Sequence, residues 1–334
     1  MALVEARGVS VVYRPAGGQR IWSVRDVDVT LAEGEFVGLV GESGCGKTTL
    51  GYALTRMLRP PARLDSGHIS FDGTDIARLG GEELRRYRRN GFAIVPQSGM
   101  NALNPVRTIG RQIGDVLKAH ARPGDDLSSA GIRHRGVELA GSVRLEADVL
   151  DRFPHELSGG MRQRVAIALA LALSPRLIVF DEPTTALDVI VQQAVISMIR
   201  DLQRERGFSA ILISHDLGVV LESTDRVMVM YAGRIVADAP AAALTTGPCH
   251  PYTEALLRCY GDPRADEVRI EGIPGTPPDL SQPDRGCAYL PRCSLASPIC
   301  PRVVPPLAPL AAGRVACHVR APSALAGAEP DDDR

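Results

Sequence analysis

The sequence feature that most constrains the fold is the glycine-rich stretch GESGCGKTT at residues 41–49. It fits the pattern G-x-x-x-x-G-K-[ST], follows the apolar run EFVGLV (35–40) and precedes a helical pattern that begins at Thr48. A strand, such a loop and a helix in this order predict a phosphate-binding site. The glycines let consecutive N–H groups point at phosphate oxygens, and the helix N-terminus adds positive potential. The alternative, a glycine-rich turn with an incidental lysine, does not explain the strand and helix on either side.

The residue types in this loop predict ATP and Mg²⁺ as ligands. Lys47 can reach the β- and γ-phosphates, and the Thr48 hydroxyl can bind Mg²⁺. We interpret Cys45 as a small filler residue. The predicted ATP-binding loop consists of Gly41, Glu42, Ser43, Gly44, Cys45, Gly46, Lys47, Thr48 and Thr49.

A second acidic element is LIVFDE at residues 177–182, where four apolar residues indicate a buried strand that ends in two carboxylates. Ligands of open α/β sheets bind at the carboxyl ends of the strands, so Asp181 and Glu182 are expected to face the same site as the loop. Asp181 suits metal holding, because a nearby cation favours a charged carboxylate. Glu182 suits polarising the attacking water.

Strand-like and helix-like segments alternate through the first 245 residues, which predicts an α/β fold with a largely parallel sheet. Residues 105–156 contain segments with helix-like patterns, and from about Gly247 proline and glycine become frequent. The length of 334 residues suits two domains, or one large domain with an appendage. The formal net charge of −1 does not indicate nucleic acid. Without a basic leader or an uncharged apolar run of ~18 residues, we expect a soluble intracellular protein.

Several motifs in order resemble the nucleotide-binding subunits of ABC transporters. Besides the loop and the acidic strand, LSGGMRQR (157–164) resembles the family signature, TTALD (184–188) the D-loop and LISHD (212–216) the switch. The resemblance implies a P-loop NTPase of the ABC type with an antiparallel β subdomain, a helical insertion and an irregular, cysteine-containing C-terminal extension. It also implies ATP hydrolysis coupled to transport.

The resemblance assigns roles residue by residue. It implies that Tyr13 stacks on adenine, that Gln97 binds Mg²⁺ or water, and that His215 contacts the γ-phosphate or the water. A core position for Tyr13 and a loop position for His215 are the plain alternatives. The catalytic set is Glu182, His215 and Gln97, and the Mg²⁺ ligands are Thr48, Gln97 and Asp181.

Two glycines at a helix start, in the signature, are unfavourable for helix formation but suit a close approach to phosphate. Because the chain already has one phosphate loop, the resemblance implies that the signature closes over ATP held by another subunit. Asp188 of the D-loop would sit at that interface, although its spacing alone indicates an ordinary helix N-cap. The signature residues are Leu157, Ser158, Gly159, Gly160 and Gln163.

The segments LNPVRTIGRQI (103–113), HPYTEALL (250–257) and GCAYLPRCSLASPIC (286–300) resemble the dipeptide, oligopeptide and nickel importers. That branch implies two permease subunits, a second and different ATP-binding subunit, an extracytoplasmic solute-binding protein acting indirectly, and a place on the cytoplasmic face of the membrane. Nickel or another small solute is the alternative substrate, and a soluble ABC ATPase of DNA repair or translation is the rival class. No nucleic-acid partner is expected. The predicted domains are 1–246, with a helical subdomain at about 100–160, an extension at 247–322 and a disordered acidic tail at 323–334.

Four of the seven cysteines lie in the extension, with the spacing C-x5-C-x6-C-x16-C: Cys287, Cys293, Cys300 and Cys317. Four thiolates can hold Zn²⁺ or a [4Fe–4S] cluster, although this is not the C-x2-C spacing of zinc ribbons. Resemblance to the importer extension favours a [4Fe–4S] cluster, with Zn²⁺ or no metal as alternatives. The expected role is structural, because a small irregular module buries little surface by itself.

Overall fold

The computed structural model describes residues 2–322 apart from 16–17, 98, 100–101, 186, 248 and 260–271. The predicted acidic tail therefore lies outside the described residues. The chain forms two compact units that are interleaved in sequence. The first unit comprises Met1–Val4, Leu31–Phe36 and Ser70–Ile213, and the second comprises Glu5–Thr30, Val37–Ile69 and Ser214–Arg334. The predicted boundary at residue 246 falls inside the second unit and stays a prediction.

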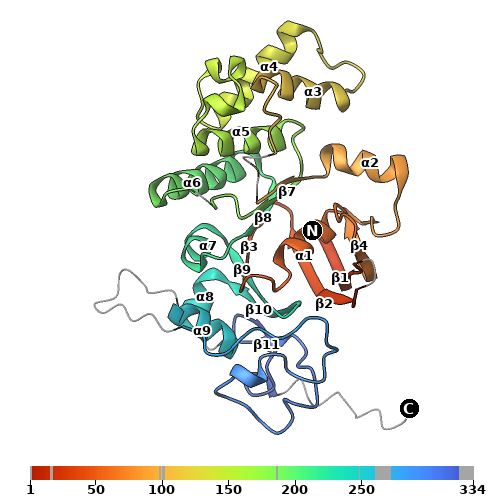
Figure 1. The fold of residues 1–334 in the computed structure, drawn as a ribbon, viewed down its shortest axis with the longest axis vertical. Helices are drawn as coiled ribbons and strands as arrows, with labels where there is room; N and C mark the ends of the chain where they lie inside the picture. Colours follow the sequence, from red (N-terminus) through yellow and green to blue (C-terminus); the bar gives the residue numbers. More distant parts are fainter. Residues whose placement is uncertain are drawn as a thin grey trace. The chain divides into compact units, whose positions relative to one another are not determined.

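The first unit is built on three parallel strands, β6 (Phe92–Val95), β7 (Leu177–Asp181) and β8 (Ser209–Ile213) (Figure 1). All residues of β7 and β8 are buried, which explains their continuous apolar sequences. Helix α5 (Gly159–Leu171) packs against β6 and against α6 (Val189–Arg206). Because β6 and β7 are parallel, the residues that follow them emerge at the same sheet edge.

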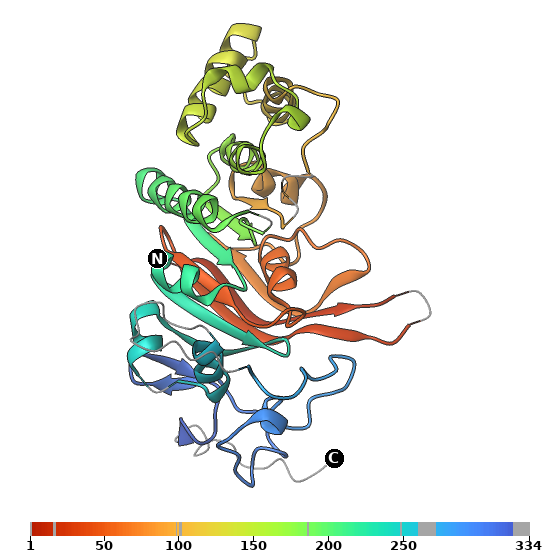
Figure 2. The same ribbon diagram turned by 60° about the vertical axis from the view of Figure 1, so that its left-hand side comes forward.

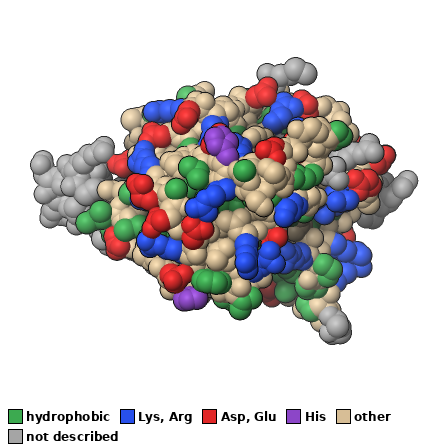
Figure 3. All heavy atoms as spheres, turned by 90° about the horizontal axis from the view of Figure 1, so that it is seen from above, with side chains coloured by type: hydrophobic (Ala, Val, Ile, Leu, Met, Phe, Trp, Pro, Cys, Tyr) green, Lys and Arg blue, Asp and Glu red, His purple; other side chains and the backbone are tan. Residues whose placement is uncertain are grey.

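The helical part of the first unit contains α3 (Ile109–Ala119), α4 (Ser129–Ser142) and the short 3₁₀ turns η2 (Ala147–Asp151) and η3 (Pro154–Glu156). Helix α4 packs against α3 and α5. The exposed ion pair of Arg133 and Asp151 joins α4 to η2. Acidic and basic side chains both reach the face seen in Figure 3. The basic stretch before β6 forms helix α2 (Gly81–Asn90), and β5 (Thr74–Asp75) pairs with the end of β4 (Ala62–Phe71).

The second unit holds the strand that precedes the glycine-rich loop. Strand β3 (Phe36–Val40) runs parallel to β9 (Arg226–Tyr231), which pairs in antiparallel fashion with β10 (Arg234–Pro240). Beyond β10 lies an antiparallel hairpin of β12 (Gly313–Val315) and β11 (Ala308–Leu310). The C-terminal extension therefore continues this sheet, with Ala237 opposite Val315.

Strands β1 (Ala2–Tyr13) and β2 (Ile21–Ala32) lie next to each other, and β4 adjoins β1 (Figure 2). The α-helices of the second unit, in its described residues, are α1 (Lys47–Leu54), α7 (Leu217–Ser223), α8 (Ala241–Thr246) and α9 (Pro251–Cys259). Among the described residues, no helix combines the length and apolar character that a membrane crossing requires.

Candidate nucleotide site

The glycine-rich loop follows β3 and passes between two backbone segments that leave no room for side chains. A Cβ atom at Gly41 would lie 2.1 Å from the Met230 carbonyl oxygen, and one at Gly46 would lie 2.1 Å from the Ser23 carbonyl oxygen. Both glycines also have positive φ angles, 149° and 109°, which side-chain-bearing residues rarely adopt. The loop path thus requires glycine at both positions.

The Lys47 side chain lies inside the loop, with 6% of its surface exposed. Its Nζ donates hydrogen bonds to the carbonyl oxygens of Gly41 at 2.7 Å and Glu42 at 3.0 Å. These carbonyls are neutral acceptors, so the ammonium can exchange them for phosphate oxygens, which bind it more strongly. Thr48 is exposed in the first turn of α1.

Tyr13 lies beside the loop. Its hydroxyl is 3.0 Å from the Thr49 hydroxyl, which also accepts a hydrogen bond from Ser23 at 3.0 Å. The ring is partly buried. Its place next to α1 is compatible with a contact to a nucleotide held by the loop, and stacking on adenine stays a prediction.

The acidic element lies in the first unit, at the end of β7. Asp181 is 1% exposed, and Glu182 has a φ of 47° while its N–H donates to the Ile213 carbonyl at 2.9 Å. A positive φ in a side-chain-bearing residue is uncommon and costs free energy. The bend it produces turns the chain immediately after the strand.

Gln97 and Glu182 meet at the edge where β6 and β7 end. The Gln97 Nε2 donates to Glu182 Oε2 at 2.8 Å, and the Thr185 hydroxyl donates to the same oxygen at 3.0 Å. The sequence placed Gln97 and Glu182 in one catalytic set, and the structure brings these two together. It adds Thr185, which the sequence reading missed although it lies within the predicted D-loop motif.

The signature residues form the start of α5. The exposed Ser158 is the N-cap, and its hydroxyl accepts a hydrogen bond from the Met161 N–H at 3.3 Å. A Cβ at Gly160 would lie 2.8 Å from Val191 Cγ1 of α6, so tight packing is a second reason for glycine there. Gln163 is 3% exposed and its Nε2 has no hydrogen-bond partner among the described residues, and Leu157 is also buried.

Asp188 is the N-cap of α6 and accepts a hydrogen bond from the Val191 N–H at 3.0 Å. This is the local role that its spacing indicated. The next two side chains, Val189 and Ile190, are 72% and 81% exposed. Adjacent exposed apolar residues are a feature of interaction surfaces.

His215 belongs to the second unit and is exposed between β8 and α7. The loop and Tyr13 belong to the same unit, whereas Asp181, Glu182, Gln97 and the signature belong to the first. The convergence of the loop with Asp181 and Glu182 stays a prediction.

The four cysteines of the extension influence one another electrostatically. Burial, with the nearby Cys300, Cys293 and Cys317, raises the pKa of Cys287 to about 11, and burial also raises the pKa of Cys293. Within the described residues, no three or more Cys, His, Asp or Glu side chains are arranged so that they could hold a metal ion. The expectation of a [4Fe–4S] cluster is therefore not supported by this structure, although the donor set suits one chemically.

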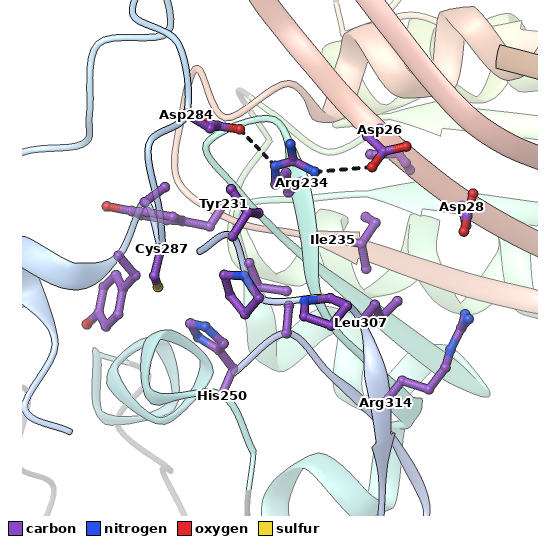
Figure 4. Close-up of a pocket in the computed structure, with 18 of the residues that line it drawn as sticks. Asp26, Asp28, Tyr231, Arg234, Ile235, His250, Asp284, Cys287, Leu307 and Arg314 are labelled. Carbon is purple, nitrogen blue, oxygen red and sulfur yellow. Dashed lines mark hydrogen bonds and ion pairs between the residues drawn. The ribbon is translucent and has the colours of Figure 1, made fainter. Parts of the chain in front are cut away.

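A cavity of about 250 Å³ lies in the second unit between β10, β2 and the extension. Among the charged residues that line it, Arg234 contacts both Asp284 and Asp26 (Figure 4). The buried His250 of this cavity accepts a hydrogen bond from the Tyr252 N–H at 3.0 Å. The ion pair of Arg234 with Asp284 joins the extension to β10.

Residues 24–185 match the family model described as ABC transporter, and residues 238–300 match the oligopeptide/dipeptide transporter C-terminal region. A Brucella abortus (strain 2308) protein whose name includes "peptide import ATP-binding protein" is 42% identical over 96% of both chains. A Sinorhizobium fredii protein whose name includes "peptide ABC transporter ATP-binding protein" is 44% identical over 92% of this chain and 85% of its own.

Among solved structures, the dimeric ATP-binding cassette MJ0796 in a post-hydrolysis state with ADP and Pi is similar, with a TM-score of 0.64 and 28% identity. The match covers 71% of this chain and 98% of that one. The predicted α/β fold of the ABC type is confirmed. The chain belongs to the ATP-hydrolysing subunits of ABC transporters, in the group that carries the oligopeptide/dipeptide transporter C-terminal region.

Proposed function

We propose that this chain hydrolyses ATP to drive the import of peptides through a membrane complex. Peptide import rests on the names of relatives that align over nearly the whole chain, and on the matching C-terminal region. The proposal that the chain uses ATP rests above all on one observation: the loop shaped by Gly41 and Gly46 encloses Lys47. Nickel or another small solute is the alternative substrate. A soluble ABC ATPase of DNA repair or translation would not account for the C-terminal region.

We assign the chemistry to residues at two places. The loop binds the phosphates, and Lys47 leaves its two carbonyls to pair with the β- and γ-phosphates. Hydroxyl, carboxylate and amide oxygens suit the hard cation Mg²⁺, which fits Thr48, Asp181 and Gln97 as its ligands. Mg²⁺, when bound, neutralises charge that develops on the phosphates.

In this proposal Glu182 polarises the attacking water, and Gln97 and Thr185 hold its carboxylate in position. Both hydrogen bonds go to the same carboxylate oxygen, Oε2. His215 contacts the γ-phosphate or orients the same water as a neutral or charged imidazole.

We further propose that the working unit is a pair of ATP-binding subunits, in which each signature covers ATP bound to the other subunit. Ser158 is exposed at a helix N-terminus, where an anion is favoured. The companion is proposed to be a different subunit. Two permease subunits and, indirectly, an extracytoplasmic solute-binding protein complete the complex, which places this chain at the cytoplasmic face of the membrane.

The four cysteines are proposed to stabilise the extension. Burial raises the pKa values of Cys287 and Cys293, and a bound metal cation would favour their thiolate forms. Iron near four atoms per chain in anaerobically purified protein would identify a [4Fe–4S] cluster, and one zinc would identify a Zn²⁺ site.

The replacement Glu182→Gln tests the proposed hydrolysis. It keeps the shape of the side chain but removes the base, so we expect steady-state ATP turnover to fall by at least 10²-fold while ATP binding is retained. Phosphate release and equilibrium ATP binding are the measurements. Asp201→Asn is the matched control, because it removes an exposed carboxylate paired with Arg144. Turnover of the Glu182 variant near that of the control would refute the assigned role.

A further inference from the structure

We propose that Arg292 of the C-terminal extension is a positioning residue of the ATP site, which holds Glu42 of the phosphate loop and thereby shapes the loop for nucleotide. The inference rests on the proposed role of residues 41–49 in binding ATP. It assigns to the extension a part in nucleotide binding that acts through the phosphate loop.

The contact between Arg292 and Glu42 is bidentate and buried on the arginine side. The two terminal nitrogens of Arg292 donate to the two carboxylate oxygens of Glu42 at 2.7 and 2.9 Å. The Arg292 side chain is 3% exposed and that of Glu42 is 24% exposed. This planar fork geometry is one that lysine cannot reproduce.

Every donor group of the Arg292 guanidinium has a partner. Besides Glu42, its nitrogens donate to the carbonyls of Pro274 at 2.8 Å and Ile273 at 3.4 Å, and to the Tyr231 hydroxyl at 3.3 Å. The guanidinium carbon also lies 5.9 Å from the ring centroids of Tyr231 and Tyr289. A fully satisfied buried cation of this kind is fixed in place and cannot move without leaving donors unpaired.

The extension also holds the main chain of Glu42. The Glu42 N–H donates to the Tyr252 hydroxyl at 2.8 Å, and Tyr252 is 0% exposed. Burial raises the pKa of Tyr252, so the phenol stays protonated. Side chain and backbone of one loop residue are therefore both bound by residues of the extension.

Glu42 in turn contacts the loop lysine, because its carbonyl accepts a hydrogen bond from Lys47 Nζ at 3.0 Å. The position of Glu42 thus fixes one of the two carbonyls that hold the ammonium. An unpaired carboxylate beside the loop would repel the phosphates of ATP. Arg292 neutralises this carboxylate and also fixes the direction in which it points.

The segment that carries Arg292 is itself anchored. Arg25 of β2 and Arg234 of β10 both pair with Asp284, and Arg25 also donates to the Leu280 and Gln282 carbonyls at 2.7 and 2.8 Å. The Cys287 N–H donates to the Cys300 carbonyl at 2.7 Å. These bonds keep the turn η4 (Leu290–Arg292) in place while the arginine reaches the loop.

The test compares the full chain with its Arg292→Met, Arg292→Lys, Glu42→Gln and double Arg292→Met/Glu42→Gln variants. We expect Arg292→Met to raise the KM for MgATP and its Kd on the order of tenfold, within the usual range of coupling between distinct sites, while kcat changes less. Arg292→Lys should restore only part of the affinity. Because the two side chains act as one pair, the double variant should bind ATP no more weakly than Arg292→Met.

Arg320→Met is the matched control, because Arg320 also pairs with a glutamate of the extension, Glu254. Melting temperatures of all variants report any general loss of stability. Unchanged ATP affinity in Arg292→Met, an equal loss in Arg320→Met, or additive losses in the double variant would overturn the inference. If the unmodified chain did not bind MgATP, the proposed function itself would fail, which is a distinct result.

Discussion

Single residues in this protein serve both the fold and the proposed chemistry, and Glu182 is an example. Its positive φ turns the chain after β7, and its carboxylate accepts hydrogen bonds from Gln97 and Thr185. The hydrogen bond from its N–H to the Ile213 carbonyl helps to offset the strain of this backbone position. A replacement at this site therefore has to keep the side-chain shape if chemistry and folding are to be separated, which is why glutamine is the informative choice.

Another residue with a testable property is His250, whose stability contribution depends on pH. Burial lowers its pKa to about 4, with a hydrogen bond to the Ala316 backbone acting in the opposite direction. Its Nδ1 accepts from the Tyr252 N–H, so protonation there would replace an acceptor with a second donor. Because the folded-state pKa lies below the unfolded value of about 6.5, the unfolded chain binds more protons between these values. The stabilisation is complete above pH 6.5 and is lost as pH falls towards 4.

We therefore expect His250 to account for a loss of about 2 kcal/mol of unfolding free energy between pH 7 and pH 5. Denaturant unfolding at the two pH values measures this loss, and His250→Asn should reduce it. His134→Asn, which changes an exposed histidine, should leave it unchanged. Equal pH dependence in the unmodified chain and in His250→Asn would contradict the expectation.

At the scale of elements, the contact between α5 and α6 joins the signature to the D-loop. Gly160 lies in the first turn of α5 against Val191 in the first turn of α6. We expect Gly160→Ala to stop ATP hydrolysis by the assembled complex without preventing ATP binding by this chain. The new methyl group would also overpack the contact by about 1–3 kcal/mol, partly offset by the roughly 1 kcal/mol higher helix propensity of alanine.

A second substitution separates the two effects of Gly160→Ala. Adding Val191→Ala makes room for the new methyl group, so it should restore the melting temperature while hydrolysis stays low. Val191→Ala alone is the control. If hydrolysis returned together with stability, glycine would be needed here for packing and not for approach to phosphate.

The elements that could be predicted were those encoded locally. The strand, loop and helix around Lys47 follow from the apolar run, the glycines and the helical pattern, and they form β3, the loop and α1. The strand β7 was likewise predicted from a short apolar run. The hairpin β11–β12 was not predicted, because strands of three residues carry no periodicity and gain their stability from pairing with β10.

The contacts of the extension with the loop could not be predicted, for a related reason. Arg292 and Glu42 lie far apart in sequence and share no motif, and either could be an exposed surface charge. The arginine is buried by Tyr231 and Tyr289, which pack against its guanidinium, while Tyr252 packs against both of these rings. Long-range electrostatic partners are set by the tertiary fold and leave no local signal.

For the molecule as a whole, the exposed pair Val189 and Ile190 next to Asp188 predicts where a partner binds. The chain carries a signature that is proposed to act on ATP held by another subunit, and these two side chains are 72% and 81% exposed. Burying such apolar side chains is favourable by about 1.5–3 kcal/mol each. A dimer that forms on ATP would therefore use this surface.

We expect the Glu182→Gln chain to dimerise with MgATP, because ATP stays bound when hydrolysis is blocked, and to be monomeric without it. Size-exclusion chromatography with light scattering measures this for the chain alone and with a companion ATP-binding subunit. Adding Ile190→Asp should abolish the dimer while ATP binding persists, since a carboxylate in an apolar contact is costly to desolvate. Val106→Asp, at a residue that is 77% exposed and lies far from the D-loop in sequence, is the matched control. A dimer that forms without ATP, or that survives Ile190→Asp, would place the partner surface elsewhere, and a dimer that forms only with the companion would identify the working unit as a pair of different subunits.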